Sequence, residues 1–145
     1  MKVKITTFIF YFFLSNIVLA DCIIVNNNAY CGKGKCVELN GVGYCSKHEN
    51  GEAHIHKGRA LCGAGKCLTQ GGSLYCSQYP GGGIIKNYGA LWSGPGKCIK
   101  HNDNVRCAKE PRGTCVNING NVKCQGGWTK EKPVLANRCE RADIL

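Results

Sequence analysis

The sequence is poor in the side chains that fill a conventional hydrophobic core. All four phenylalanines and the only methionine fall within the first 20 residues. The remaining chain holds 22 valine, isoleucine and leucine residues, but it keeps all 12 cysteines and all 20 glycines. Apolar burial alone does not stabilise a chain of this composition, which is typical of proteins held by disulfides. The sequence therefore predicts a small, disulfide-rich, mostly β protein made of tandem short β-hairpin modules with little helix.

The first 20 residues contain no acidic side chain and have the pattern of a secretory signal peptide. Two lysines precede an apolar run over 5–20 that ends in small residues. Ser15 and Asn16 interrupt this run, which is shorter than the ~20 apolar residues of a membrane-spanning helix. We expect cleavage after Ala20 and secretion into an extracellular, oxidising compartment. There the cysteines are expected to form disulfides rather than zinc sites.

Acidic residues are scarce in the rest of the chain as well. Without the two leader lysines, 17 lysine and arginine residues stand against 9 aspartate and glutamate residues, a net charge of +8. Basic secreted proteins tend to collect on acidic glycans or other anionic surfaces. The positive residues are scattered along the sequence, so the charge is equally consistent with plain solubility, and we expect no nucleic-acid partner. No Asn-x-Ser/Thr sequon occurs, so no N-linked glycan is expected.

A 15-residue pattern that ends in a Cys-x8-Cys pair recurs along the chain. The copies are CGKGKCVELNGVGYC at 31–45, CGAGKCLTQGGSLYC at 62–76, SGPGKCIKHNDNVRC at 93–107 and EPRGTCVNINGNVKC at 110–124. Cys22 and Cys31 form a fifth pair at the same spacing. Asn, Gly or Asp occupies both central positions of every pair, and these residues tolerate the positive φ of a type I′ turn. The pattern predicts five hairpins with turns at 26–27, 40–41, 71–72, 102–103 and 119–120.

The predicted register gives each hairpin two different faces. In the hairpin over 36–45, a two-residue turn places Val37 and Tyr44 on one face and both cysteines on the other. The residue after the first cysteine is aliphatic in all five hairpins. An isolated hairpin is marginal in water, so bridges and neighbouring modules must stabilise it. The Gly-x-Gly-Lys before three of the pairs leads into a strand and not into the helix of a phosphate loop, and its glycines are expected to allow a tight turn.

Parts of the sequence resemble an EGF-like domain. The spacing Cys22-x8-Cys31-x4-Cys36-x8-Cys45, with CGKGKC and the ending GVGYC, looks like the first four cysteines of that family. The stretch PRGTCVNINGNVKCQGGW is similar to its central hairpin and Gly-aromatic turn. The resemblance implies the disulfides Cys22–Cys36 and Cys31–Cys45. The repeats are degenerate, because they lack the fifth and sixth cysteines; the fifth position holds Lys47, Gln78 and Gly126.

Hairpin geometry allows a second disulfide connectivity. The two cysteines of each hairpin occupy a non-hydrogen-bonded pair, where Cβ atoms approach closest. The bridges would then be 22–31, 36–45, 67–76, 98–107 and 115–124, with Cys62 and Cys139 left as the sixth. The sequence does not decide between the two connectivities. Under either, we expect disulfides from Cys22, Cys31, Cys36, Cys45, Cys62, Cys67, Cys76, Cys98, Cys107, Cys115, Cys124 and Cys139.

The cysteine pairs divide the chain into modules and cysteine-poor segments. We expect a signal peptide at 1–20, module 1 at 21–46, a polar linker at 47–61, module 2 at 62–79, a Gly-rich bridge at 80–93, module 3 at 94–109, module 4 at 110–128, and a tail at 129–145 tied back by its cysteine. Helix is expected only as a short turn near 140–144.

No residue pattern predicts catalysis. No Ser-His-Asp arrangement stands out, and oxidised cysteines are not free to act as nucleophiles. His54 and His56 are residues that could bind zinc or copper as neutral imidazoles. Histidines in a polar linker are commonly just solvated, so we assign no catalytic residue, no metal and no cofactor.

Loop aromatics are the candidate binding residues. Tyr79, Tyr88 and Trp92 lie in or beside the Gly-rich bridge, and Trp128 follows a Gly-Gly pair. Such residues serve either as binding platforms or as a small core between modules. We expect a secreted interaction protein, effector-like or an extracellular ligand, that binds a receptor, matrix or cell-wall component. The alternatives are a basic toxin, antimicrobial or protease inhibitor, which would use an anionic membrane or a protease, and a structural wall or matrix protein.

Overall fold

The computed structural model describes residues 21–145, so the predicted signal peptide lies outside the described residues. All regular structure in this range is β-strand, as predicted. Residues 21–145 include no helix long and apolar enough to cross a bilayer. The helical turn expected near 140–144 is wrong. Those residues form two short strands because they pair with the edges of earlier hairpins.

Seven antiparallel hairpins follow one another along the chain. They are β1 (Asp21–Val25) with β2 (Asn28–Gly32), β3 (Cys36–Leu39) with β4 (Val42–Cys45), β5 (Ala53–His56) with β6 (Arg59–Cys62), β7 (Cys67–Gln70) with β8 (Ser73–Cys76), β9 (Gly83–Asn87) with β10 (Ala90–Gly94), β11 (Cys98–His101) with β12 (Asn104–Ala108), and β13 (Cys115–Ile118) with β14 (Asn121–Cys124). Both central residues of every turn have positive φ, from 45° at Asn102 to 87° at Gly120. Five of these hairpins are the predicted ones, in the predicted register.

The other two hairpins occupy the segments that the sequence predicts to be a linker and a bridge. β5 and β6 lie within the expected linker at 47–61 and its following cysteine, and β9 and β10 lie within or beside the expected bridge at 80–93. Their turns are Lys57-Gly58 and Tyr88-Gly89, with positive φ at each residue. These segments therefore continue the array of hairpins instead of separating modules.

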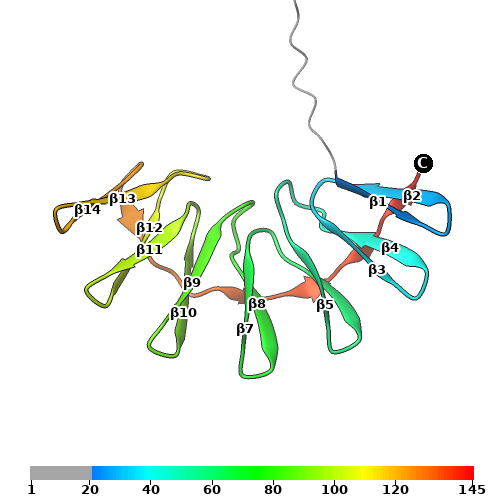
Figure 1. The fold of residues 1–145 in the computed structure, drawn as a ribbon, viewed down its shortest axis with the longest axis horizontal. Coiled ribbons are helices and arrows are strands. Elements are labelled where there is room, and N and C mark those ends of the chain that lie inside the picture. Colours follow the sequence, from blue (N-terminus) through cyan, green and yellow to red (C-terminus); the bar gives the residue numbers. More distant parts are fainter. Residues whose placement is uncertain (1–20) are drawn as a thin grey trace, which may run out of the picture.

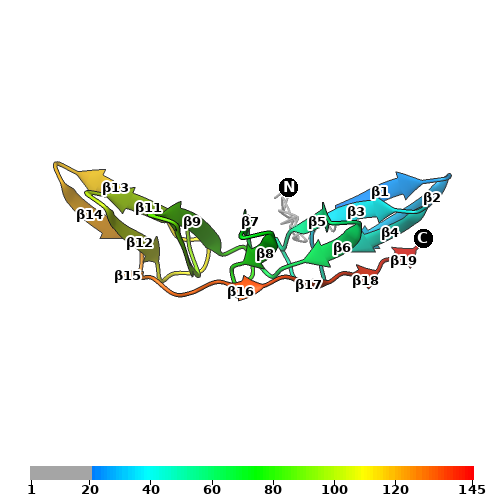
Figure 2. The same ribbon diagram turned by 90° about the horizontal axis from the view of Figure 1, so that it is seen from below.

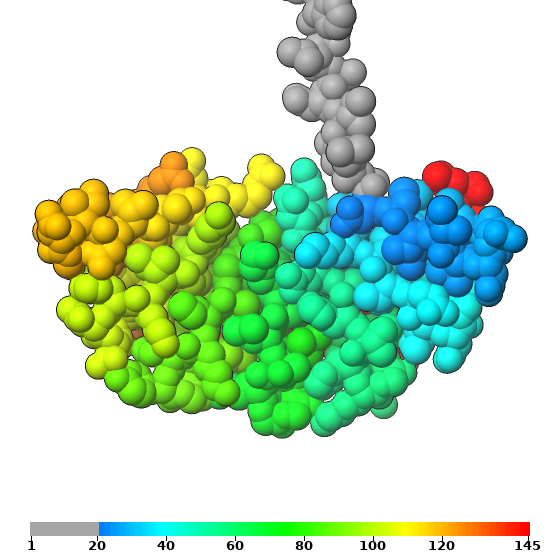
Figure 3. Space-filling model, viewed as in Figure 1, coloured from blue at the N-terminus to red at the C-terminus, as the bar shows by residue number. Residues whose placement is uncertain are grey.

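The hairpins stand next to one another in a curved array. Figure 1 shows their turns along the outer, convex rim and the connections between hairpins along the inner rim. In the space-filling view, the residues of successive hairpins form adjacent bands from blue to orange (Figure 3). Contacts join each hairpin to its neighbours in sequence, and between β5–β6 and β7–β8 they are side-chain contacts such as that of Leu61 with Leu74. The architecture is that of a solenoid, in which each repeat contacts only the repeats beside it.

The last 18 residues, 128–145, return along the array; we call this segment the strap. Its strands pair with the second strands of successive hairpins: β15 (Trp128–Thr129) with β12, β16 (Val134–Leu135) with β8, β17 (Asn137–Arg138) with β6, β18 (Glu140–Arg141) with β4, and β19 (Asp143–Ile144) with β2. Glu131 adds an isolated bridge to Ser93 of β10. Figure 2 shows the strap running along one edge of the array. It therefore connects hairpins that are far apart in the sequence.

The disulfides follow hairpin geometry. Five join opposite residues of one hairpin, with Cα atoms 3.9–4.1 Å apart: Cys22–Cys31, Cys36–Cys45, Cys67–Cys76, Cys98–Cys107 and Cys115–Cys124. The sixth, Cys62–Cys139, ties the strap to β6. The pairing implied by the EGF-like resemblance, Cys22–Cys36 and Cys31–Cys45, is wrong, because each of these cysteines faces its partner across its own hairpin. Six disulfides indicate an extracellular or secreted protein.

The core consists of thin layers between hairpins. Each hairpin has two faces. The cysteine face carries the two cysteines of the Cys-x8-Cys pair, or the residues at the same positions in β5–β6 and β9–β10. The aliphatic face carries the residue that follows the first of these two positions. Tyr30, on the aliphatic face of β1–β2, packs against Gly43 on the cysteine face of the next hairpin. Leu61 packs in the same way against Leu74 and Cys76. Because no layer is large, the disulfides provide stability that a continuous core would otherwise provide.

Candidate functional site

Three of the four predicted binding aromatics lie where the strap crosses β9–β12. Trp92 belongs to β10, Trp128 to β15, and Tyr79 to the connection after β8. The fourth, Tyr88, lies in the turn of the β9–β10 hairpin, where it is exposed. The structure therefore brings three of these residues together at the strap and leaves the fourth on the outer rim.

Two lysines of the strap converge on the indole of Trp92. The Nζ atom of Lys130 lies 4.4 Å and that of Lys132 lies 3.9 Å from the ring centroid. Ser93 and Glu131 exchange two backbone hydrogen bonds of 2.8 and 2.9 Å, which hold this part of the strap beside β10. Since side chains alternate along an extended strand, the residues before and after Glu131 project to the same side. Attraction between each ammonium and the ring quadrupole favours this arrangement.

The acidic residue between the two lysines is engaged elsewhere. The hydroxyl of Tyr79 donates a hydrogen bond of 2.8 Å to Oε1 of Glu131. This hydrogen bond raises the pKa of Tyr79, because it stabilises the neutral phenol beside a carboxylate. Within residues 21–145, the ion pairs involve only Glu52, so neither Lys130 nor Lys132 is neutralised by a carboxylate. The Trp92 cluster is therefore a concentrated positive charge.

A second cation–aromatic pair lies next to this cluster along the strap. The guanidinium carbon of Arg106 is 4.9 Å from the ring centroid of Trp128. Pairing of Ala108 with Trp128 brings the ring alongside β12, which carries Arg106. The Trp128 side chain is about half exposed. We call the combined surface the aromatic–cation strip; it consists of Trp92, Arg106, Trp128, Lys130 and Lys132.

The exposed Tyr88 makes contacts between two hairpin turns instead. Its hydroxyl hydrogen-bonds with Asp103, which raises the pKa of the phenol. The side-chain amide of Asn87 donates to the backbone carbonyl of Asp103 at 2.9 Å. These contacts join the turns of two neighbouring hairpins, so Tyr88 is not part of the strip.

A row of lysines repeats along the inner rim. Lys35, Lys66 and Lys97 end the three Gly-x-Gly-Lys connections, at intervals of 31 residues, and all are exposed. The backbone N–H of each donates to a glycine carbonyl in the following connection at 2.9–3.0 Å; the acceptors are Gly51, Gly82 and Gly113. The same local structure is thus built three times, which places one positive side chain at an equivalent position in each repeat.

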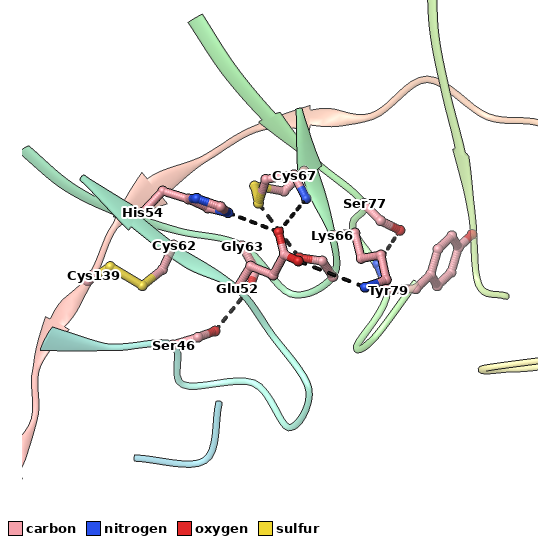
Figure 4. The surroundings of a disulfide bond; sticks show 12 residues. Ser46, Glu52, His54, Cys62, Gly63, Lys66, Cys67, Ser77, Tyr79 and Cys139 are labelled. Atoms are coloured by element: carbon pink, nitrogen blue, oxygen red, sulfur yellow. Dashed lines mark hydrogen bonds and ion pairs between the residues drawn. A yellow bond between two sulfur atoms is a disulfide. The ribbon is translucent and has the colours of Figure 1, made fainter. Parts of the chain in front are cut away.

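Glu52 is the acid at the centre of the only group that resembles a metal site in residues 21–145 (Figure 4). Its Oε2 accepts the backbone N–H of Cys67 at 2.9 Å and lies 2.9 Å from Nε2 of His54. Lys66 Nζ is 3.9 Å from Oε1. Burial alone would raise the pKa of Glu52, but the His54 and Cys67 hydrogen bonds and the neighbouring positive groups outweigh it, so the pKa is lowered.

This group is arranged as a structural junction. Cys67 is in a disulfide, so its sulfur is not a thiolate ligand. The Nε2 of His56 lies 3.0 Å from the backbone carbonyl of Gly72. The Glu52 carboxylate instead joins the β5–β6 hairpin to the β7–β8 hairpin through His54 and Cys67.

The aromatic residues of the strip could be named from the sequence, but their cationic partners could not. Arg106, Lys130 and Lys132 acquire their role only when the strap pairs with β10 and β12. The sequence carries one signal for them, the alternation of lysine and glutamate in WTKEK directly after the Gly-Gly pair. The chain matches no protein-family model, no curated protein and no solved structure.

Proposed function

We propose that this is a secreted binding protein that attaches to an acidic glycan of a matrix or cell wall through the aromatic–cation strip. The observation that carries the proposal is the convergence of Lys130 and Lys132 on Trp92 without a neutralising carboxylate. Two ammonium groups on one half-buried ring favour a ligand that presents carboxylate or sulfate groups. The indole and the Trp128 ring add apolar contact area beside the charges.

Repetition in the molecule favours a repeating partner. Lys35, Lys66 and Lys97 place one lysine per 31-residue repeat along the inner rim, and Lys66 also lies 3.9 Å from the Glu52 carboxylate. An acidic polysaccharide carries anionic groups at regular intervals and can contact several repeats at once, which raises the apparent affinity without any single strong contact. The resemblance of the sequence to EGF-like repeats is consistent with this proposal, because that family consists of cysteine-rich extracellular interaction modules.

Binding to immobilised polysaccharides tests the proposal. The folded, oxidised protein is applied to a sulfated glycan, a carboxylated glycan and a neutral glucan, and the dissociation constant is measured at two salt concentrations. We expect binding to at least one acidic glycan that weakens as salt screens the charges, and no binding to the neutral one. The double variant K130Q/K132Q is expected to bind about tenfold more weakly, which corresponds to about 1.4 kcal/mol.

A matched double variant distinguishes binding at the strip from a general effect of net charge. K57Q/K86Q removes two exposed lysines outside the strip and lowers the net charge by the same amount. An equal loss of affinity in both double variants would show non-specific electrostatics and would rule out the strip as the site. Binding and leakage of anionic vesicles, with no glycan binding, would support the toxin alternative instead. Capture by a proteinaceous receptor alone would also contradict the glycan proposal.

A further inference from the structure

One arrangement recurs at the internal interfaces of the array. The aliphatic face of one hairpin covers the cysteine face of the next, as Tyr30 covers Gly43 and Leu61 covers Leu74. The residue two positions before the last cysteine of a hairpin, or before the equivalent Ser93 of β10, lies at the centre of this contact. Interior residues at this position are 2–7% exposed: Ala60, Leu74, Leu91 and Val105.

Within residues 21–145, the two ends of the array each leave one such face uncovered. At the β13–β14 end the aliphatic face is open, with Val116 50% and Ile118 56% exposed. At the β1–β2 end the cysteine face is open, with Ile24 80% exposed. Leu145, 87% exposed, extends this second face, because its backbone N–H binds the carbonyl of Ala29 and places it beside that residue. Repeat proteins that stay monomeric usually cover such ends with polar capping repeats.

The two open faces are complementary in kind and in charge. One is an aliphatic face and the other a cysteine face, the same two surfaces that pack together inside the chain. Lys123 lies opposite Val116 and so shares the open aliphatic face. Asp143 lies opposite Cys31 and so shares the open cysteine face. Both charged side chains are exposed.

We propose that a second copy of this chain stacks on the array head to tail. The aliphatic face of β13–β14 in one copy packs on the cysteine face of β1–β2 in the next and continues the internal interface. The contact is heterologous, so it generates a growing chain of copies, or a ring if the curvature closes. Because one hairpin layer is a small area, association is expected to be weak and to depend on protein concentration.

Sedimentation of end-blocked variants tests this proposal. The secreted, oxidised protein is measured by analytical ultracentrifugation from about 10 µM to about 1 mM, a range suited to small interfaces. We expect the weight-average mass to rise at least about twofold. V116K/I118K blocks one end and I24K blocks the other, so each variant alone is expected to stay monomeric. Mixed in equal amounts, the two variants are expected to form a dimer, because each keeps the end that the other lacks.

Leu135→Lys is the matched control for the end variants. Leu135 lies in the strap strand β16, away from both ends of the array, and is 58% exposed. This variant is expected to associate like the unmodified protein. A wild-type protein that stays monomeric over the whole range would overturn the proposal. So would a dimer formed by one end variant alone, which indicates a symmetric contact, or a mixture that does not associate. Circular dichroism and the absence of free thiols establish that each variant is folded.

Discussion

Close packing explains the first glycine of each Gly-x-Gly-Lys connection. A Cβ atom on Gly32 or Gly63 would lie 2.3 Å from the Cβ of Cys45 or Cys76 on the next hairpin, and one on Gly94 would lie 2.5 Å from its counterpart. None of these glycines has positive φ. These glycines are expected from the sequence to allow a tight turn, but the structure shows that they let the connection pass directly over a half-cystine.

Gly63→Ala is expected to destabilise the protein through this contact. The neighbouring Cβ belongs to the Cys67–Cys76 disulfide and has little room to move, so overpacking is expected to cost about 3 kcal/mol. Gly58→Ala is the control: its φ is +72° but nothing lies within 4 Å, so the expected cost is only about 1 kcal/mol. Thermal unfolding of both variants measures the difference. Equal melting temperatures would contradict the packing explanation.

The Glu52 carboxylate is expected to make stability depend on pH. Its folded pKa is lowered, so its contribution is complete above the unfolded pKa of about 4.3 and is lost as pH falls through the folded pKa. Glu52→Gln keeps an acceptor for the Cys67 N–H but removes the charge, and we expect a loss of about 1 kcal/mol near pH 7 that disappears on acidification. Urea unfolding between pH 7 and pH 3 measures this. Glu49→Gln, an exposed neighbour, should change little at any pH, and a pH-independent effect at Glu52 would show that charge is not its role.

At the scale of elements, the strap is the part held least by local structure. Each of its strands has two residues, and its strand partners lie up to 114 residues away, as Ile144 does from Tyr30. Its one covalent tie, Cys62–Cys139, spans a sequence separation of 77, whereas the hairpin disulfides span 9. The Cys62–Cys139 disulfide is therefore expected to contribute more to holding the strap in place than a hairpin disulfide contributes to its own hairpin.

Removing the strap disulfide is expected to cost more than removing a hairpin disulfide. Loop-closure entropy corresponds to about 4.5 kcal/mol for the long loop and about 2.6 kcal/mol for the short one. The double variants C62S/C139S and C22S/C31S are compared by denaturant unfolding and by amide hydrogen exchange. In C62S/C139S we expect faster exchange at the strap amides that pair with β6, such as the amide at position 139, which donates to the Ala60 carbonyl in the unmodified protein. Unchanged exchange there would mean that backbone pairing alone holds the strap.

The elements also show what local sequence can and cannot predict. Five hairpins are predictable because Asn, Gly and Asp mark their turns between paired cysteines. The β5–β6 and β9–β10 hairpins were missed because the first has one cysteine and the second has none, and because Lys57 and Tyr88 are unusual residues at positive φ. The strap was missed as a set of strands because two-residue strands have no periodicity. Its pairing is set by contacts between residues far apart in the sequence, and the placement of the cations in the aromatic–cation strip depends on that pairing.

At the scale of the whole molecule, repetition connects the two proposals. The lysines of the inner rim recur every 31 residues, and the end faces repeat the surfaces that join hairpins within the chain. If copies stack, the lysine row continues from one copy to the next, and attachment to a polymer gains additional points of contact. The two tests remain independent, because the strip variants leave the end faces unchanged and the end variants leave the strip unchanged.

The course of the strap also orders the steps of oxidative folding during biosynthesis. Each hairpin disulfide joins residues nine positions apart and can close as soon as its hairpin meets an oxidant. Cys62 must instead keep its thiol reduced, among newly formed neighbours, until Cys139 leaves the ribosome. A disulfide exchange at Cys62 in that interval would trap a mispaired hairpin and leave the strap without its anchor. We therefore expect a disulfide isomerase that acts after synthesis ends to raise the yield of correctly paired protein.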